Sequence, residues 1–241
     1  MMLKALNGKI CDLLFPPRCP VCDRVMAPGD RKKGVCAECR NDLKLIKEPR
    51  CLKCGAQLKA DEEEYCRSCR GRRHYYDRGL ALYEYASVRS TIYRLKYSGR
   101  LEYADFFGRE MARRLGPAIR EWGAEALIPV PLHASRQRRR GYNQAAAIAR
   151  ACGRALDLPV REDIIRRARN TRPMTLLDAK ERKRNLKNAF IMLQDVVKLS
   201  IVVVVDDIYT TGSTIDAMAA LLKASGVKKV YFVTLAIGSG V

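Results

Sequence analysis

The sequence predicts an α/β protein in which a mostly parallel sheet is flanked by helices and a small N-terminal module binds metal. The run from Ile201 to Val205 is continuously apolar, as expected for a strand buried on both faces of a parallel sheet. Strand-loop-helix units recur along the second part of the chain, and four CxxC pairs gather near its beginning. Such pairs are typical of closed metal sites. We therefore expect two domains, residues 1–75 and residues 76–241.

The composition indicates an anionic partner. The 241 residues include 46 Lys and Arg against 26 Asp and Glu, a formal net charge of +20, which predicts attraction to nucleic acid or polyphosphate. A basic solubilising surface from a heat-adapted source is the alternative. No apolar run reaches the length that spans a membrane, and polar residues interrupt any signal-peptide core near the N-terminus. We expect a cytoplasmic protein without a membrane span.

Eight cysteines form the four CxxC pairs, which we predict to hold structural zinc. Each pair places two thiolates on one ion, and four thiolates complete a tetrahedral shell. Repeated pairs in a cytoplasmic chain indicate metal rather than disulfides, and redox chemistry is the weaker alternative. CPVCD and CLKCG look like knuckle turns, whereas CAECRNDL and CRSCRGRR are able to open short helices. This alternation favours sequential pairing over an interleaved one, with one zinc on Cys19, Cys22, Cys36 and Cys39 and a second on Cys51, Cys54, Cys66 and Cys69.

So short a module cannot bury much apolar surface, and we expect metal binding to provide its fold. We expect the module to brace the larger domain and to contact a partner. Cys11 lies outside the pairs and is expected to be a small buried hydrophobe.

The segment after the cysteines predicts one strand and two helices, over residues 79–85, 87–96 and 101–121. The second helix is expected to bend or end around Gly116 and Pro117. Between the helices, Lys96, Tyr97 and Arg100 lie in a loop near a glycine. This arrangement suits an anionic ligand, and a solvated basic turn is the alternative.

A strand over residues 126–131 leads into a basic loop and then an alanine-rich helix. Guanidinium groups in such a loop can hold a polyanion through paired hydrogen bonds, and an exposed charge run is the alternative. The loop residues are Arg136, Arg138, Arg139, Arg140 and Gly141. Asn143 and Gln144 are expected to cap the helix or to orient the loop, and His133 is assigned no role.

Residues 166–188 are long, polar and very basic, and we interpret them as a mobile lid whose closure excludes water. Short strands are expected on both sides of the lid, over residues 160–165 and at AFIML. The last strand is VKKVYFVTL, residues 227–235.

The strand that begins at Ile201 ends at two acids and a hydroxyl-rich loop, in the run IVVVVDDIYTTGST, before an amphipathic helix. A loop at the carboxyl end of a parallel strand binds phosphates through backbone N–H groups and hydroxyls. Gly212 allows the backbone to approach closely, and Asp206 and Asp207 suit sugar hydroxyls or a nearby divalent cation. The alternative is an ordinary turn and N-cap. The run is not a P-loop, because no Gly-Lys-Ser/Thr follows.

This run resembles the phosphoribosyl-pyrophosphate (PRPP) motif of type I phosphoribosyltransferases. With the cysteine module, LKYSGR, PVPLHASRQRRRGYNQA and ERKRNLKNAF, it makes nearly the whole chain similar to the ComF (ComFC) family. These are phosphoribosyltransferase-like proteins of bacterial DNA uptake and competence. The resemblance implies a type I phosphoribosyltransferase-like fold and a site for PRPP with Mg²⁺. Met174 stands where the family usually has Gln, so the resemblance does not extend to a Gln contact in the lid.

The resemblance also implies residue roles. Asp206 and Asp207 would hold the ribose 2′- and 3′-hydroxyls and serve catalysis. The 5′-phosphate would be held by Thr210, Thr211, Gly212, Ser213 and Thr214. The pyrophosphate would be held by Arg136, Arg138, Arg140 and Gly141, and the lid would contribute Thr171, Arg182 and Asn185.

Three classes of function follow. An enzyme would transfer the 5-phosphoribosyl group to a nitrogen nucleophile and release pyrophosphate. A non-catalytic protein would keep the PRPP site as a ligand sensor while it handles incoming single-stranded DNA, with tyrosines as base-stacking platforms. The candidate tyrosines are Tyr83, Tyr85, Tyr93, Tyr97 and Tyr103. A structural adaptor would dock a helicase or another competence partner through the zinc module.

Overall fold

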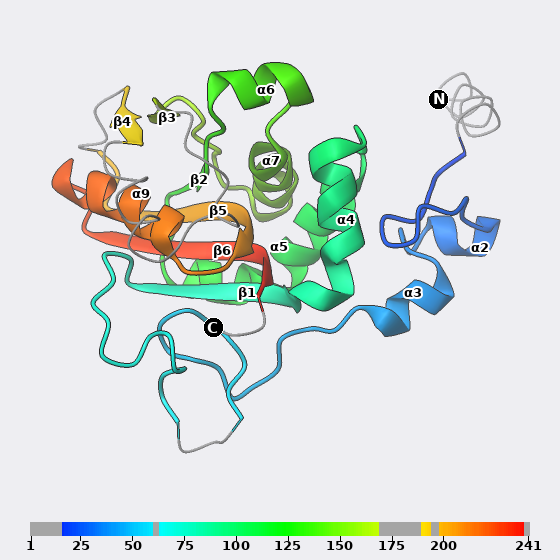
Figure 1. Cartoon of the computed structure of the whole chain (residues 1–241), viewed down its shortest axis with the longest axis horizontal. Coiled ribbons are helices and arrows are strands. Elements are labelled where there is room, and N and C mark those ends of the chain that lie inside the picture. Colours follow the sequence, from blue (N-terminus) through cyan, green and yellow to red (C-terminus); the bar gives the residue numbers. More distant parts are fainter. Residues whose placement is uncertain (1–15, 60–62, 169–188, 194–197, 239–241) are drawn as a thin grey trace.

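The computed structural model describes residues 16–59, 63–168, 189–193 and 198–238, and in this part of the chain a four-stranded parallel sheet forms the centre (Figure 1). The strand order is β1-β6-β5-β2. The strands are β1 Arg78–Glu84, β6 Lys229–Ile237, β5 Ile201–Tyr209 and β2 Ala126–Pro129. All neighbouring pairs in this sheet are parallel, which confirms the predicted fold class.

β5 lies inside the sheet because its side chains are apolar on both faces. Residues 202–205 are fully buried, and successive side chains of a strand point to opposite faces. Val202 and Val204 pack in one apolar cluster, whereas Val203 and Val205 pack in another. Val205 pairs with Pro129 of β2 and Val233 of β6, so the carboxyl ends of the three strands meet at one edge.

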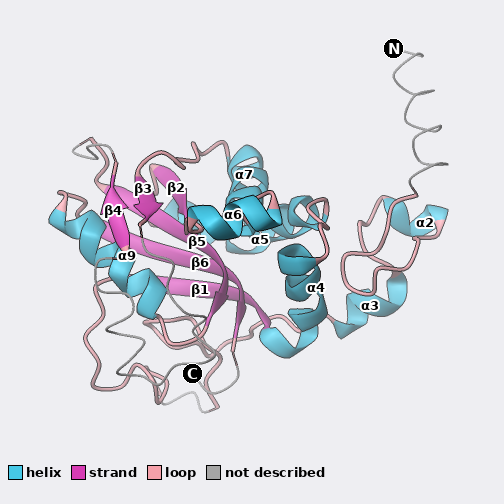
Figure 2. Cartoon of the chain, turned by 45° about the horizontal axis from the view of Figure 1, so that its top comes forward, coloured by secondary structure: helices cyan, strands magenta, loops and turns pink. Residues whose placement is uncertain are grey.

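Helices cover both faces of the sheet. α4 Tyr85–Tyr97, α5 Tyr103–Glu121 and α7 Gln144–Leu156 share the cluster of Val203 and Val205, and α9 Ser213–Ala224 shares the cluster of Val202 and Val204. Figure 2 shows α9 and α5 on opposite sides of the sheet. No helix in the described residues is both long and apolar enough to cross a membrane.

α5 packs closely on α7 because it carries small residues. A Cβ added at Gly108 would lie 2.4 Å from the Cβ of Ala151, and one at Gly116 would lie 2.8 Å from Leu156 Cδ2. The helix continues through Pro117 to Glu121, so it does not end where the sequence suggested. The buried side chains on both sides of the proline, Leu115 and Ile119, hold the helix together by tertiary packing.

The remaining elements are short: α2 Pro28–Arg31, α3 Ala37–Asp42, α6 Ala134–Arg140, and an antiparallel pair of β3 Ile165–Arg167 with β4 Phe190–Met192. The basic stretch expected as a loop is a helix, α6. His133 caps its start by accepting a hydrogen bond from the Ser135 backbone N–H, and Gly141 ends it at a φ of 83°. α3 follows Cys36 as expected, whereas the residues around Cys66 and Cys69 form turns instead of the expected helix.

Candidate functional site

The hydroxyl-rich loop encloses a hollow at the carboxyl end of β5. The hollow is small, with a cavity volume of about 20 Å³, and is lined by Asp206 and by residues 208–215. Gly212, at a φ of 74°, is the N-cap of α9 and gives it no side-chain cap bond. The first N–H groups of α9 therefore face the hollow without a capping side chain, an arrangement that favours an anion.

Two hydroxyls border this helix start. Thr211 Oγ1 and Ser213 Oγ lie 2.9 Å apart and share a hydrogen bond. A phosphate placed in the hollow would receive donors from these hydroxyls and from backbone N–H groups. The structure thus brings together Asp206 and all five of the predicted loop residues, 210–214.

Asp207 faces the opposite side of β5 and is 3% exposed. Its Oδ2 lies 2.5 Å from Nζ of Lys96, which comes from the last turn of α4. Its Oδ1 accepts a hydrogen bond of 3.3 Å from Nε2 of Gln144, the first residue of α7. The second acid is therefore held by two helices, and only Asp206 lines the hollow.

The two adjacent carboxyls titrate differently. Burial, together with the neighbouring charge of Asp207, raises the pKa of Asp206 well above its ordinary value. Burial also opposes ionisation of Asp207, but the ammonium of Lys96 outweighs it and lowers the pKa of Asp207. The ligand-facing carboxyl therefore holds a proton more readily than the one paired with lysine.

Cations from α6 border the acids. Arg136 and Arg140 are half-buried, whereas Arg138 and Arg139 are exposed. Arg140 donates a hydrogen bond to Oε1 of Gln144, and its guanidinium carbon lies 5.5 Å from the ring centroid of Tyr97. Of the predicted pyrophosphate residues, the structure thus brings Arg140 into the network around Asp207.

Sequence reasoning gave Arg167 of β3 no individual role. This arginine is 8% exposed, and its guanidinium carbon lies 5.4 Å from the ring centroid of Phe190. Burial, and secondarily the charge of Arg136, lowers the pKa of Arg167 to about 10, so it stays charged at neutral pH. The expected strand ended at residue 165, so Arg167 fell within the expected lid. Extending the strand to residue 167, as in the structure, would have separated Arg167 from the lid. The sequence analysis singled out both Lys96 and Asp207 but did not predict that they form an ion pair.

The predicted lid contacts Thr171, Arg182 and Asn185, and also Met174, lie outside the described residues. The same holds for Cys11.

The eight paired cysteines form two clusters, and their grouping is sequential as predicted. In each cluster the four Sγ atoms lie within 4.8 Å of one another. Across the pairs, the Sγ atoms of Cys22 and Cys36 lie 3.8 Å apart and those of Cys54 and Cys66 lie 3.6 Å apart. A tetrahedral zinc with Zn–S bonds of about 2.3 Å separates its sulfurs by about 3.8 Å, so both donor sets fit zinc. We call residues 16–45 the first cysteine module and residues 46–77 the second.

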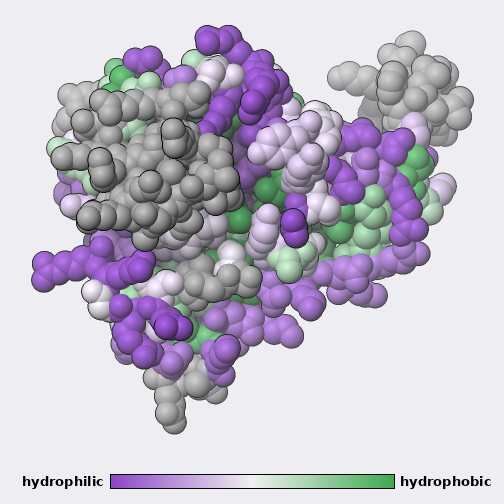
Figure 3. All heavy atoms as spheres, in the orientation of Figure 1, coloured by the Kyte–Doolittle hydropathy of each residue, from purple (hydrophilic) through white to green (hydrophobic). Residues whose placement is uncertain are grey.

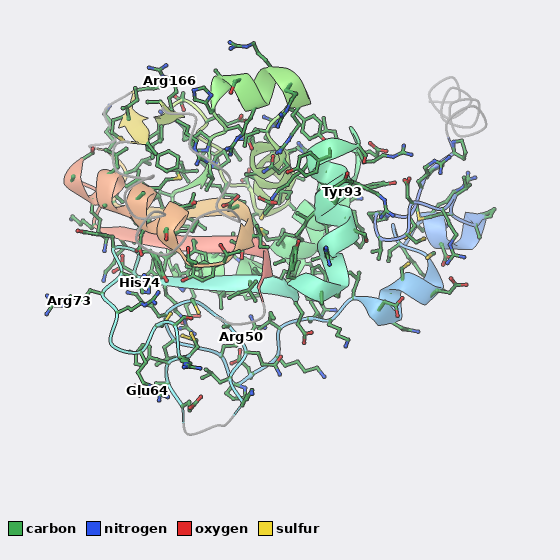
Figure 4. All side chains as sticks on the ribbon, viewed as in Figure 1. Arg50, Glu64, Arg73, His74, Tyr93 and Arg166 are labelled. Atoms are coloured by element: carbon green, nitrogen blue, oxygen red, sulfur yellow. The ribbon has the colours of Figure 1, made fainter. Side chains whose placement is uncertain are left out.

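Two tyrosines extend from the site onto the surface. Tyr93 and Tyr97 of α4 are 61% and 62% exposed, and their ring centroids lie 5.0 Å apart. Figure 4 shows Tyr93 on α4, and Figure 3 shows hydrophilic residues gathered over α6 next to it. By contrast, Tyr83 and Tyr103 are buried.

Comparisons with known proteins agree with this organisation. Residues 10–70 match the double zinc ribbon domain family, and residues 138–239 match the phosphoribosyl transferase domain family. The chain is 34% identical to competence protein F of Haemophilus influenzae over 83% of this chain and 88% of that protein. It is 33% identical to the DNA utilization protein YhgH of Escherichia coli K12 over 89% and 94% of the two chains. It is 27% identical to competence protein ComFC of Bacillus subtilis over 80% of this chain and 79% of that protein.

Proposed function

The chain belongs to the competence protein F (ComF) family, with a double zinc ribbon and a phosphoribosyltransferase domain, and from this premise we propose that it binds PRPP with Mg²⁺ and serves the handling of incoming single-stranded DNA. The observation that carries the PRPP proposal is the hollow at the end of β5. It combines a carboxylate, two hydroxyls and a helix N-terminus at the edge where parallel α/β sheets bind phosphorylated ligands.

In the proposed complex the loop residues 210–214 hold the 5′-phosphate and Asp206 accepts hydrogen bonds from the ribose. Asp207 reaches the second ribose hydroxyl when Lys96 turns toward the diphosphate, which competes for its ammonium. Arg136, Arg138 and Arg140 of α6 hold the diphosphate. Mg²⁺ suits such a ligand because it prefers phosphate and carboxylate oxygens, and it would neutralise part of the diphosphate charge beside Asp206.

The proposed reaction breaks the bond between C1′ and the diphosphate oxygen, and the diphosphate leaves with the electron pair. A nitrogen nucleophile then forms the new bond to C1′ and loses a proton. The chain contributes position, through the carboxylates on the ribose, and electrostatic stabilisation of the leaving group, through its arginines and Lys96. The non-catalytic alternative uses the same ligand contacts without the transfer.

Replacing both acids, Asp206→Asn with Asp207→Asn, tests the PRPP site. We expect binding of PRPP with Mg²⁺, measured by isothermal titration calorimetry, to weaken at least about a hundredfold, since two carboxyl groups that contact the ribose are lost. Asp163→Asn, which alters an exposed carboxylate paired with Arg161, is the matched control and keeps the affinity. Undiminished binding by the double variant overturns the assignment. Pyrophosphate release against a panel of nitrogen bases then separates the enzyme from the ligand sensor.

The exposed pair Tyr93–Tyr97 favours the second candidate function, binding of single-stranded DNA. Exposed aromatic rings beside cationic side chains form the surface that single-stranded nucleic acids use, because bases stack on the rings while cations contact phosphates. The pair is contiguous with Arg140 and thus with the basic helix α6.

The first cysteine module, next to α4 in Figure 1, is the surface we propose for a helicase or competence partner.

Tyr93→Ala with Tyr97→Ala tests the stacking surface. We expect a labelled oligothymidine to bind roughly tenfold to a hundredfold more weakly in fluorescence anisotropy, from about 1–3 kcal/mol for one base stacked on the pair. The two Tyr→Phe changes keep the rings and the affinity. Tyr75→Ala removes a tyrosine that is also 61% exposed but lies elsewhere, and it serves as the control. Equal weakening by Tyr75→Ala would contradict a specific platform.

A further inference from the structure

The second cysteine module is connected to the start of α9. Nδ1 of His74 lies 2.6 Å from Oδ2 of Asp216, and the backbone N–H of Tyr75 donates to Asp216 Oδ1 at 2.9 Å. Because a carboxylate can only accept, His74 Nδ1 carries the proton. Asp216 lies in the first turn of α9, two residues beyond Thr214. Figure 4 shows His74 on the segment that leads into β1.

A second connection runs through the core to the turn of the phosphate loop. Tyr76 is fully buried, and its hydroxyl lies 2.7 Å from that of Tyr209, the last residue of β5. A Cβ added at Gly212 would lie only 2.5 Å from the Tyr209 hydroxyl oxygen. The Tyr209 side chain therefore lies directly against the turn that gives the hollow its shape.

The module itself contacts these tyrosines. Lys53 lies inside the knuckle between Cys51 and Cys54, and its ammonium is 5.3 Å from the ring centroid of Tyr76. The backbone carbonyl of Lys53 accepts a hydrogen bond from Gly79 of β1 at 2.9 Å. All four cysteines of the module share one apolar cluster with Tyr76, Tyr209 and Ile215. Contacts thus run without interruption from the metal ligands to the phosphate loop.

We propose that Asp216 and Tyr209 are positioning residues through which the second cysteine module fixes the phosphate loop, so that the loop is ordered only while this module is intact. The described contacts of the first module run instead to α4, α5 and, through Lys44 and Leu45, the end of β1. The proposal rests on the proposed function only in assuming that the ordered loop binds a phosphorylated ligand.

Asp216→Asn tests the connection in the zinc-loaded full chain. Asparagine keeps an oxygen for the Tyr75 N–H but cannot repeat the charged contact with His74. Tyr209→Phe removes the hydroxyl next to Gly212. Asp77→Asn is the matched control, because Asp77 also joins the second module to α9 but does so at Lys223, 2.8 Å away in the last turn.

Hydrogen exchange of the amides of residues 210–214, measured without ligand, reads loop order directly. We expect roughly tenfold faster exchange in Asp216→Asn and in Tyr209→Phe, and wild-type exchange in Asp77→Asn, with zinc content unchanged in all three. Exchange as slow as in the wild type, or equal acceleration in Asp77→Asn, overturns the proposal.

Calorimetry with PRPP and Mg²⁺ supplies the second readout. We expect about tenfold weaker binding in Asp216→Asn and no change in Asp77→Asn. If wild-type protein does not bind PRPP, the proposed function fails, and the exchange measurement still decides whether the module positions the loop.

Discussion

The two cysteine modules carry the same CxxC pairs but are built into the protein in different ways. In the first, Cys22 and Cys36 are half-buried, and the module packs on the outside of α4 and α5. In the second, all four cysteines are buried and belong to the same apolar cluster as Val202, Val204 and α9. The modules also lie on opposite faces of the sheet, since the two clusters contain alternate residues of β5.

The docking contacts differ in the same sense. The first module is held by side chains of α4 that donate to its knuckle carbonyls, Thr91 to Pro20 at 2.6 Å and Arg94 to Val21 at 2.6 Å. Its backbone pairs with β1 only at its last residues, Lys44 and Leu45, away from the described cysteines. The second is held by backbone pairing with β1, through Lys53 and Gly79, and by shared core. The same CxxC motif therefore forms a peripheral module in the first case and a part of the main hydrophobic core in the second.

Removing one zinc ligand from each module gives the largest expected difference. Cys54→Ser opens a metal site inside the main core, so we expect the chain to lose cooperative folding, because structural zinc contributes about 10–16 kcal/mol in small zinc domains. Cys22→Ser is expected to leave a folded domain that retains one zinc. Thermal unfolding together with zinc content measures both. Equal loss of folding in the two variants would contradict the difference.

Three glycines with a positive φ allow the tightness of packing around the two modules to be compared. Gly55, Gly34 and Gly71 have φ values of 72°, 73° and 72°, so alanine carries the same backbone strain of about 1–2 kcal/mol at each. A Cβ at Gly55 would lie 2.6 Å from the Gly79 carbonyl oxygen, one at Gly34 would lie 2.8 Å from the Phe106 ring, and one at Gly71 meets nothing within 4 Å.

We expect Gly55→Ala to lower the free energy of unfolding by roughly 4 kcal/mol, because the backbone of β1 must move. Gly34→Ala should lower it by roughly 2–3 kcal/mol, because the Phe106 side chain can shift, and Gly71→Ala by about 1–2 kcal/mol, from backbone strain alone. Chemical denaturation gives the order. If Gly34→Ala proves as costly as Gly55→Ala, the first module is packed as tightly as the second.

Replacing Asp23 is expected to have the smallest effect on stability, and this effect should depend on pH. Its carboxylate accepts a hydrogen bond from Tyr103 and pairs with Arg100 at 3.2 Å. Burial acts to raise its pKa, but these two partners lower the net value. Since the folded-state pKa is below the unfolded value of about 3.9, the stabilisation is present above about pH 4 and is lost as the pH falls through the folded-state pKa.

Asp23→Asn should therefore lower the free energy of local unfolding of the first module by roughly 1 kcal/mol at neutral pH. In the variant, the stability of the module should no longer fall as the pH drops through the folded-state pKa of Asp23. Amide exchange of residues 19–39 measures the effect. Exchange in residues 210–214 is expected to stay as in the wild type, and an equal change there would show that the first module also reaches the phosphate loop.

The sequence by itself determined the parts whose signals are local. The valines of β5 identified a buried parallel strand, because only a strand covered on both faces is apolar at every position. The CxxC pairs identified the eight cysteines of the metal sites, because two thiolates three residues apart already form half of a site. Their sequential grouping was only favoured by the sequence, and the structure decided it against the interleaved alternative. The acids and hydroxyls that follow β5 identified the loop, since strand, loop and helix are consecutive.

Only the tertiary structure decided which distant residues meet. Lys96 and Asp207 are ion-pair partners separated by more than a hundred positions, and His74 meets Asp216 across a similar interval. The sequence also could not choose among the tyrosines, because helical spacing leaves Tyr93 and Tyr97 exposed only once α4 has packed. The reason is physical. Local patterns fix the backbone of an element, whereas side-chain partners and burial depend on how several elements pack together.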